Sequence, residues 1–249
     1  MRIFDSDIAY GCPERALPGR VETADEALAE MDHCGIANAL VWHYDAYCRD
    51  FATGNRRVAQ LAGHSRLHPC FTFVPPCCDE MPSPEGLLAE MRAAGARAAR
   101  AFPGKHCFCM DSVSCGELFE AFIAASIPVF LPLPELSDRW NGVYRIMKDF
   151  PRLRLVLTQT GCWGEDRYFR PLMKAFPGFH ITTDRFETAG QLKSLVDSVG
   201  PQQLLFASGL PFNYPGGYIL MLARAEIGDS AKEAIACSNI ERLLGEAQP

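Results

Sequence analysis

The fold is decided by residues 204–215, LLFASGLPFNYP, which combine a short apolar strand with an abrupt stop. The apolar run ends in Ala-Ser-Gly, and Pro211 and Pro215 prevent the backbone from continuing as a strand. Helical patterns follow at residues 217–225 and from residue 230 to the segment CSNIERLLG. We therefore expect this stretch to be the last strand of a parallel barrel, followed by a loop suited to a site.

The length and composition of the chain agree with one such barrel. Its 249 residues are close to the size of a single (β/α)8 barrel, and 48% hydrophobic content is ample for a large core. No linker, low-complexity segment or charge block divides it. We expect one TIM-barrel domain spanning residues 1–249.

Short apolar runs alternate with amphipathic patterns along the chain. Strands are expected at residues 3–9, 37–42, 70–74, 96–102, 128–133, 153–158, 179–183 and from 204. Helices are expected at residues 23–34, 55–63, 85–94, 115–125, 144–150, 169–176 and 191–199. The first helix has a Thr23/Glu26 capping box and ends at Gly35. Eight regularly alternating strands indicate an α/β fold closed as a (β/α)8 TIM barrel in preference to an open doubly wound sheet.

The net charge and the cysteine content limit which binding partners and which cellular compartment are expected. The formal net charge of -6, without a Lys/Arg cluster, argues against nucleic acid or an acidic membrane surface as partner. No apolar run reaches the roughly 18 residues of a membrane span, and strand-like sequence from Arg2 leaves no room for a signal peptide. The eleven cysteines are odd in number and several lie in apolar runs, which favours reduced thiols. We expect a cytoplasmic protein with a small-molecule ligand, which could be anionic.

In a parallel barrel, functional residues lie at the carboxyl ends of the strands and in the loops that follow. Asp5 and Asp7 share one face of the first strand by its period of two, so both carboxylates are buried together if that face is the interior. The other candidate site residues at strand ends are Tyr10, His43, Tyr44, Arg100, His106, Gln159, Trp163, Asp184, Arg185 and Asn213.

Several segments in this order resemble the amidohydrolase superfamily, in particular its small metal-dependent barrel hydrolases and decarboxylases. The segments are IFDSDIAYG, MDHCGIANALV, FPRLRLVLTQTG, LLFASGLPFNYP and CSNIERLLG. The resemblance covers nearly the whole chain. It implies a TIM barrel, hydrolase or lyase chemistry and a homodimer.

The chain departs from the family pattern at the metal ligands. Asp7 and Ala9 stand where the family has two histidines on the first strand, and Pro132 and Gln159 stand near its histidines on strands five and six. Gly209 replaces the family aspartate of strand eight. A catalytic zinc site needs about three donors from His, Cys, Asp or Glu, and these side chains do not supply them. We therefore expect the family metal centre to be lost and no cofactor to be required.

Other residues could carry chemistry in a rebuilt site. We assign catalytic roles to Asp7, His43 and Asp184 as acid and base groups; alternatively, these three could bind a metal that the family does not use. The remaining candidates, Asp5, Tyr10, Tyr44, Arg100, His106, Gln159, Trp163, Arg185 and Asn213, are assigned to substrate binding. Arg100 and Arg185 could clamp a carboxylate or phosphate, because a guanidinium offers two parallel donors. The alternative is that these arginines hold the carboxylates in a buried ion-pair network.

The cysteines suggest two less favoured sites. Cys77 and Cys78 follow the third strand, while Cys107 and Cys109 follow the fourth, so two adjacent loops could build a zinc site or accept a metal that the family does not use. Their spacing matches no strong signature, and free thiols packed as small hydrophobes are favoured. Cys162 could be a nucleophile, but no histidine is obviously paired with it.

Two function classes remain open at this point. The first is a hydrolase-like enzyme that acts on a small organic acid, ester, lactone or amide without the family metal. The second is a non-catalytic barrel, a pseudoenzyme, that binds a small ligand or a protein partner. A reachable pocket in which an acid or His faces an Arg or amide donor favours the enzyme. A mouth plugged by Phe212, Trp163 and the proline loops favours the second class.

Overall fold

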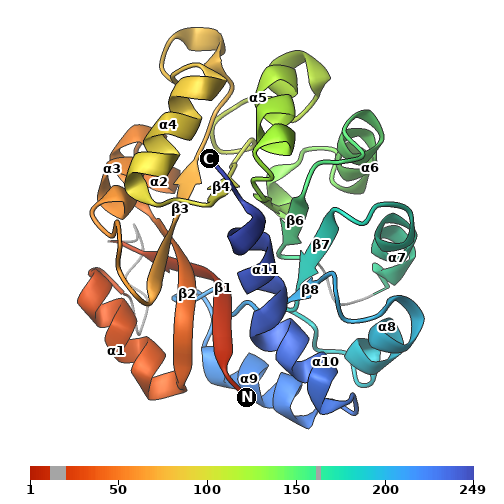
Figure 1. Ribbon diagram of the computed structural model, residues 1–249. Coiled ribbons are helices and arrows are strands. Elements are labelled where there is room, and N and C mark those ends of the chain that lie inside the picture. Colours follow the sequence, from red (N-terminus) through yellow and green to blue (C-terminus); the bar gives the residue numbers. More distant parts are fainter. Residues whose placement is uncertain (12–20, 161–163) are drawn as a thin grey trace.

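The computed structural model describes residues 1–11, 21–160 and 164–249, and its described part is a barrel of parallel strands ringed by helices (Figure 1). The strands are β1 (Ile3–Tyr10), β2 (Ile36–His43), β3 (Leu67–Thr72), β4 (Ala98–Arg100), β5 (Val129–Pro132), β6 (Leu155–Thr158), β7 (Phe179–Thr182) and β8 (Leu204–Leu205). Each strand is hydrogen-bonded in parallel to the next, in the order β1 to β8. The expected (β/α)8 TIM barrel is confirmed.

The helices follow the strands in the expected alternation. They are α1 (Ala24–Cys34), α2 (Asp45–Cys48), α3 (Phe51–Ala59), α4 (Pro84–Ala94), α5 (Ser112–Ala124), α6 (Trp140–Asp149), α7 (Asp166–Ala175), α8 (Gln191–Val199), α9 (Pro215–Arg224), α10 (Asp229–Glu233) and α11 (Asn239–Glu246). Short 3-10 turns, η1 (Pro76–Cys78) and η2 (Leu133–Glu135), follow β3 and β5, and a π-helical turn, η3 (Ala234–Ser238), joins α10 to α11.

The barrel closes between β1 and the segment that follows β8. The amide of Ser6 donates to the Phe206 carbonyl at 2.9 Å, and the amide of Ala9 donates to the Leu210 carbonyl at 2.8 Å. A register shift between Asp5 and Ile8 marks a bulge in β1 opposite β2. The bulge interrupts the simple alternation of side chains along β1, so Asp5 and Asp7 reach different surroundings.

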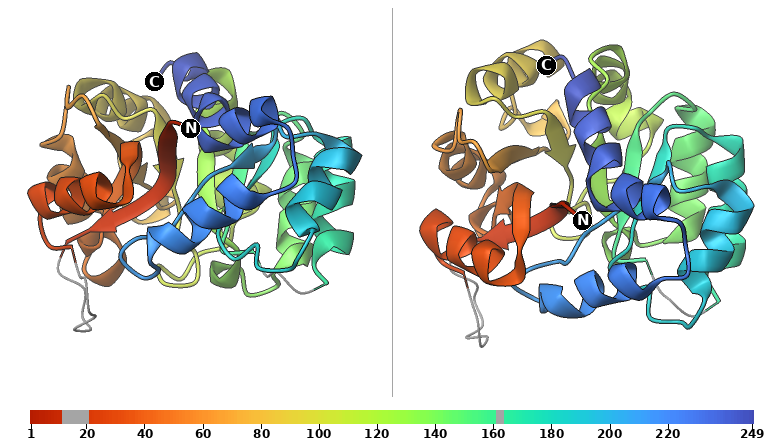
Figure 2. Two further views of the ribbon diagram at one scale, coloured as in Figure 1. Left: turned by 90° about the horizontal axis from the view of Figure 1, so that it is seen from below. Right: turned by 60° about the horizontal axis from the view of Figure 1, so that its bottom comes forward.

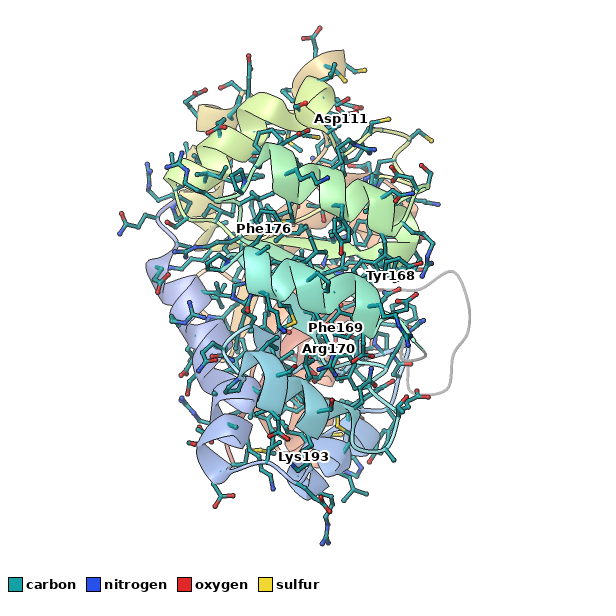
Figure 3. The ribbon with its side chains drawn as sticks, turned by 90° about the vertical axis from the view of Figure 1, so that its right-hand side faces the viewer. Asp111, Tyr168, Phe169, Arg170, Phe176 and Lys193 are labelled. Carbon is teal, nitrogen blue, oxygen red and sulfur yellow. The ribbon has the colours of Figure 1, made fainter. Side chains whose placement is uncertain are left out.

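The helices pack their apolar sides onto the barrel and contact one another through polar edges. Phe169 of α7 is fully buried, whereas its neighbour Arg170 reaches α8 (Figure 3). The Arg170 guanidinium donates to the carbonyl and hydroxyl of Ser194 and to the hydroxyl of Ser198. It also pairs with Asp166 one turn earlier in α7. Such contacts fix the spacing of the helix ring around the strands.

Local sequence signals explain some of the element boundaries. The Thr23/Glu26 capping box of α1 is present, and Gly35 ends that helix in the left-handed conformation with φ of 72°. The helix expected at residues 55–63 is wrong in its bounds, because α3 begins after an Asp50 N-cap and ends at Ala59. The third strand runs from Leu67 to Thr72 and therefore starts earlier than the expected residue 70.

A helix covers one end of the barrel, whereas a cavity lies at the other. Helix α11 lies across the amino-terminal end, beside the start of β1 (Figures 1 and 2). Asn239, at the start of α11, donates from Nδ2 to the Leu204 and Pro201 carbonyls at 2.9 and 2.7 Å, which ties α11 to β8. The carboxyl-terminal end carries the cavity described below. Among the described residues, no helix has the length and apolar character needed to cross a membrane.

Candidate active site

A cavity of about 400 Å³ lies at the carboxyl ends of the strands. It is lined by residues from seven of the eight strand ends or the loops after them, which is where sites of this fold are found. The lining residues are Asp7, Trp42, Tyr44, Tyr47, Phe102, Pro132, Glu135, Gln159, Asp184, Arg185, Gly209, Leu210, Phe212 and Asn213. The cavity thus combines three carboxyl groups and one guanidinium with an aromatic wall.

Asp184, two residues beyond β7, is a buried carboxyl group that lines the cavity. It is 2% exposed and accepts a short hydrogen bond from the Thr182 hydroxyl. Burial raises the pKa of Asp184 to about 6, and the negative charge of Asp7 acts in the same direction. The Thr182 hydroxyl and the Arg185 charge favour the ionised form and limit the rise. A carboxyl group with such a pKa can both donate and accept a proton.

Asp7, on β1, is held by two donors on one oxygen. Its Oδ1 accepts a hydrogen bond from Trp42 Nε1 at 2.9 Å and one from Arg100 Nη2 at 2.6 Å. Trp42 and Arg100 come from β2 and β4, so three separate strands fix this carboxylate. Arg100 itself is 1% exposed and does not line the cavity.

Asp5 is buried, as Asp7 is, but its carboxylate binds backbone amides where the barrel closes. Its Oδ1 accepts from the amides of Asp7 at 3.0 Å and Ser208 at 3.1 Å. Burial raises the pKa of Asp5 to about 7, in spite of the hydrogen bonds from Ser208 and from the Asp7 amide. Asp5 does not line the cavity, so the bulge in β1 separates two carboxylates that strict alternation places on one face.

Three lining residues around the cavity mouth adopt the left-handed backbone conformation. Gln159 and Arg185 have φ of 56° and 68°, and Gly209 has φ of 68°. This conformation is uncommon for residues other than glycine, asparagine and aspartate. It turns the chain sharply after strands β6, β7 and β8. Asn213 supports the last of these loops by donating from Nδ2 to the Ser208 carbonyl at 3.2 Å.

The aromatic wall is continuous around one side of the cavity. The ring of Trp42 lies 5.0 Å from that of Phe102 and 6.1 Å from that of Tyr44. Tyr44 in turn contacts Phe212 at 5.6 Å, and Tyr47 meets Phe102 edge-on at 5.1 Å. Ring centroids at these distances are typical of favourable aromatic pairs, and together they form a surface suited to a flat, aromatic ligand.

Three candidate residues lie away from the cavity. His43 is packed edge-on against the Tyr10 ring at 4.8 Å, and its Nδ1 accepts from the Asp45 amide at 3.1 Å. Burial lowers the pKa of His43, and the Tyr10 hydroxyl donates to the Arg57 carbonyl at 3.1 Å. His106 contacts Phe102 edge-on, and burial lowers its pKa also. Trp163 and Cys162 lie outside the described residues.

The donor set does not fit a divalent metal of the family type. Within residues 1–11, 21–160 and 164–249, no group of three His, Cys, Asp or Glu side chains is placed to hold a metal ion. Ala9, Pro132 and Gly209 carry no side-chain donor, and the Asp7 Oδ1 already accepts two hydrogen bonds. In the loops after β3 and β4, Cys77, Cys78, Cys107 and Cys109 are exposed and free.

The sequence reasoning missed several lining residues. Trp42, Tyr47 and Phe102 line the cavity, as do Phe212 and Glu135, which follows the fifth strand but was assigned no role. Trp42 and Phe102 stand at or near strand ends, so their position was a usable signal, but apolar residues there are equally typical of the core. Tyr47 and Glu135 follow their strands in short helical turns that the residue pattern does not reveal.

Comparisons with known proteins give a fold and no close relative. No family model and no curated protein matches the sequence. An uncharacterized TIM-barrel protein from Bordetella bronchiseptica superposes with a TM-score of 0.75 at 17% identity, covering 99% of both chains. The 2,6-dihydroxybenzoate decarboxylase from Rhizobium has a TM-score of 0.76 at 16% identity, covering 98% of both.

Three further solved structures have a similar fold. A dihydroxybenzoic acid decarboxylase from Polaromonas sp. JS666, solved with bound manganese and the inhibitor 2-nitroresorcinol, has a TM-score of 0.73 at 14% identity and covers 98% of this chain and 97% of its own. Proteins named as amidohydrolases match with TM-scores of 0.75 and 0.71. The chain therefore has the fold of the amidohydrolase-superfamily TIM barrels.

Proposed function

We propose that the chain is a metal-independent enzyme that binds a small aromatic carboxylic acid, or its ester, lactone or amide, and moves a proton through Asp184. The observation that carries the proposal is the meeting of Asp184, Asp7 and Arg185 with an aromatic wall in one cavity. The fold neighbours named as decarboxylases act on dihydroxybenzoates, which are small aromatic acids, and this supports the same ligand class here.

Arg185, the aromatic wall and Asp184 each have a role in this chemistry. The Arg185 guanidinium lines the cavity mouth and offers paired donors to a ligand carboxylate. The aromatic wall holds the ring, and Asp184 delivers a proton from its buried carboxyl group. In a decarboxylation the proton goes to the ring carbon that loses carbon dioxide. In a hydrolysis it goes to the leaving oxygen or nitrogen while a water molecule attacks the carbonyl.

Binding should be tested before turnover. The purified chain in a chelator-containing buffer is titrated calorimetrically with 2,6-dihydroxybenzoate and with benzoate. We expect saturable binding to the wild type and at least a tenfold loss of affinity in Arg185→Gln. Arg224→Gln is the matched control, because Arg224 is also an exposed arginine near this end of the barrel but does not line the cavity. Equal affinity in both variants would refute the assignment of Arg185.

Turnover is then measured by chromatography for acids, aryl esters, lactones and amides that bind. We expect Asp184→Asn to lose at least a hundredfold in kcat and to keep its affinity, because general acid–base catalysis contributes roughly a hundredfold to ten-thousandfold. Binding by the wild type without turnover of any compound would favour the second candidate, a ligand-binding barrel. The lack of side-chain donors at Ala9, Pro132 and Gly209 is the observation that keeps this candidate open.

A further inference from the structure

A buried guanidinium stands beneath the cavity and is directed at one of its two innermost carboxylates. Arg100 is among the largest fully buried side chains of the chain, with 1% of its surface exposed. Its guanidinium carbon lies 5.0 Å from the ring centre of Trp42, 5.7 Å from that of Phe102 and 5.8 Å from that of Phe130. Burial of a charge among rings costs several kcal/mol unless the charge is paired.

The charge of Arg100 is paired with Asp7. Nη2 contacts the Asp7 Oδ1 at 2.6 Å, and Nε and Nη1 have no hydrogen-bond partner among the described residues. Trp42 Nε1 binds the same oxygen at 2.9 Å. A charge-assisted hydrogen bond and a second donor on one oxygen hold that carboxylate in a single position.

Asp184 experiences the opposite surroundings in the same cavity. It is 2% exposed, and the ionised Asp7 opposes a second negative charge there. The other charged or titratable group beside it on its own loop is Arg185, and Tyr218 approaches it from α9. Asp7 in turn faces Asp5 on its own strand and Cys70 on β3, besides Arg100.

We propose that Arg100 is a positioning residue that divides the two cavity carboxylates between roles: it holds Asp7 as a fixed carboxylate and thereby leaves Asp184 to carry the mobile proton. Two carboxylates in one cavity repel each other when both are ionised, so an unequal environment decides which one keeps the proton. The buried guanidinium on β4 supplies that inequality without a metal ion. The use of the proton rests on the proposed function, whereas the division itself is a property of the free protein.

The test follows the carboxyl groups directly. Protein with ¹³C-labelled aspartate side chains is titrated by NMR without ligand, and Asp184→Asn and Asp7→Asn assign the two signals. In the wild type we expect the Asp184 signal to titrate near pH 6. In Asp7→Asn, a near-isosteric change, the pKa of Asp184 should fall by at least one unit, a tenfold loss of proton affinity, because a negative charge is removed and Arg100 is left unpaired.

Arg100 is tested by a neutral and a conservative substitution. In Arg100→Met, the pKa of Asp184 should rise, because the positive charge that offsets Asp7 is removed. In Arg100→Lys, which keeps the positive charge, the Asp184 titration of the wild type should be retained. An unchanged Asp184 titration in Asp7→Asn overturns the proposal, and this variant decides alone if Arg100→Met does not fold.

The outcomes separate this proposal from the proposed function. If the pKa of Asp184 changes as expected in Asp7→Asn and Arg100→Met, but the protein neither binds nor converts the aromatic acids, the role of Arg100 is supported and the proposed function is refuted. If the protein converts a ligand but the pKa of Asp184 is unchanged in Asp7→Asn, only the role of Arg100 is refuted.

Discussion

Asp5 and Asp184 are both enclosed carboxyl groups, and each retains its proton at a pH where a solvated aspartate has lost it. The pKa of Asp5 is raised to about 7 and that of Asp184 to about 6 by burial. Above pH 4 the unfolded chain has released both protons, so folding takes protons up between about pH 4 and 7. These two groups therefore stabilise the folded state at low pH, and their contribution is lost as pH rises through the folded-state values.

Asp5→Asn should reveal this dependence. An Asn Oδ1 can still accept from the amides of Asp7 and Ser208, so the closure of the barrel is kept. Wild-type stability should fall relative to that of the variant by up to about 1.4 kcal/mol per pH unit between pH 5 and 7. Urea unfolding at several pH values measures the difference, to which Asp184 does not contribute because it is common to both proteins. Parallel stability curves for the two proteins would contradict the buried, protonated state of Asp5.

At the scale of elements, two helical glycines differ in what surrounds them. Gly54 lies in α3, where an added Cβ would meet the backbone and side chain of Ala46 on α2. Gly116 lies in α5, where an added Cβ would meet no atom within 4 Å. Close approach of α2 and α3 at Ala46 therefore requires the missing side chain at position 54.

The pair gives a matched prediction. Gly54→Ala should lower the free energy of unfolding by roughly 1–3 kcal/mol, because α2 and α3 must move apart. Gly116→Ala should raise it by about 0.5–1 kcal/mol, because alanine loses less backbone entropy in a helix. Chemical denaturation of both variants checks the signs. A stabilised Gly54→Ala would mean that the two helices can separate at little cost.

Sequence patterns predicted elements better than contacts between them. The capping box of α1 and the order of strands follow from local residue chemistry, and both are confirmed. Asn55 was taken as a helix start, but it lies inside α3, where its amide group exchanges hydrogen bonds with the backbone of Thr72 at 2.7 and 2.8 Å. That tertiary contact satisfies a polar side chain that local preferences place at a helix end.

The candidate site shows the same limit. Asp7, Asp184 and Arg185 were found because strand ends of a parallel barrel converge. The ion pair of Arg100 with Asp7 agrees with the alternative of a buried ion-pair network. The separation of Asp5 from the cavity depends on a bulge in β1 that the residue types do not reveal. The roles assigned to these residues, including that of His43, stay predictions.

At the scale of the whole molecule, the barrel separates stability from chemistry. Helix α11 covers the amino-terminal end and is tied to β8 by Asn239, whereas the cavity occupies the carboxyl-terminal end. Substitutions at the covered end should therefore change unfolding more than ligand binding. The homodimer implied by the resemblance stays a prediction that light scattering in solution can test.

Metal removal tests whether a bound ion stabilises the folded protein. Because the described donor set does not fit a divalent ion, a chelator should leave the midpoint of thermal unfolding unchanged, and added Mn²⁺ or Zn²⁺ should not raise it. A site that binds only the folded state would stabilise it by about 2.7 kcal/mol when the ion is present at a hundredfold excess over its Kd. Near-stoichiometric metal in the purified protein, or a clear rise in the midpoint, would contradict this expectation.

The left-handed backbone at Gln159 and Arg185 has a consequence for the history of this chain. Glycine or asparagine adopts that conformation at lower cost, so chance substitution at either position would be tolerated by the fold and even favoured by it. A lineage in which the cavity had fallen out of use would drift toward those residues. Relatives that retain a glutamine and an arginine at these positions would indicate continued selection for a functional cavity. Relatives that have lost both residues would identify the branch in which the cavity lost its function.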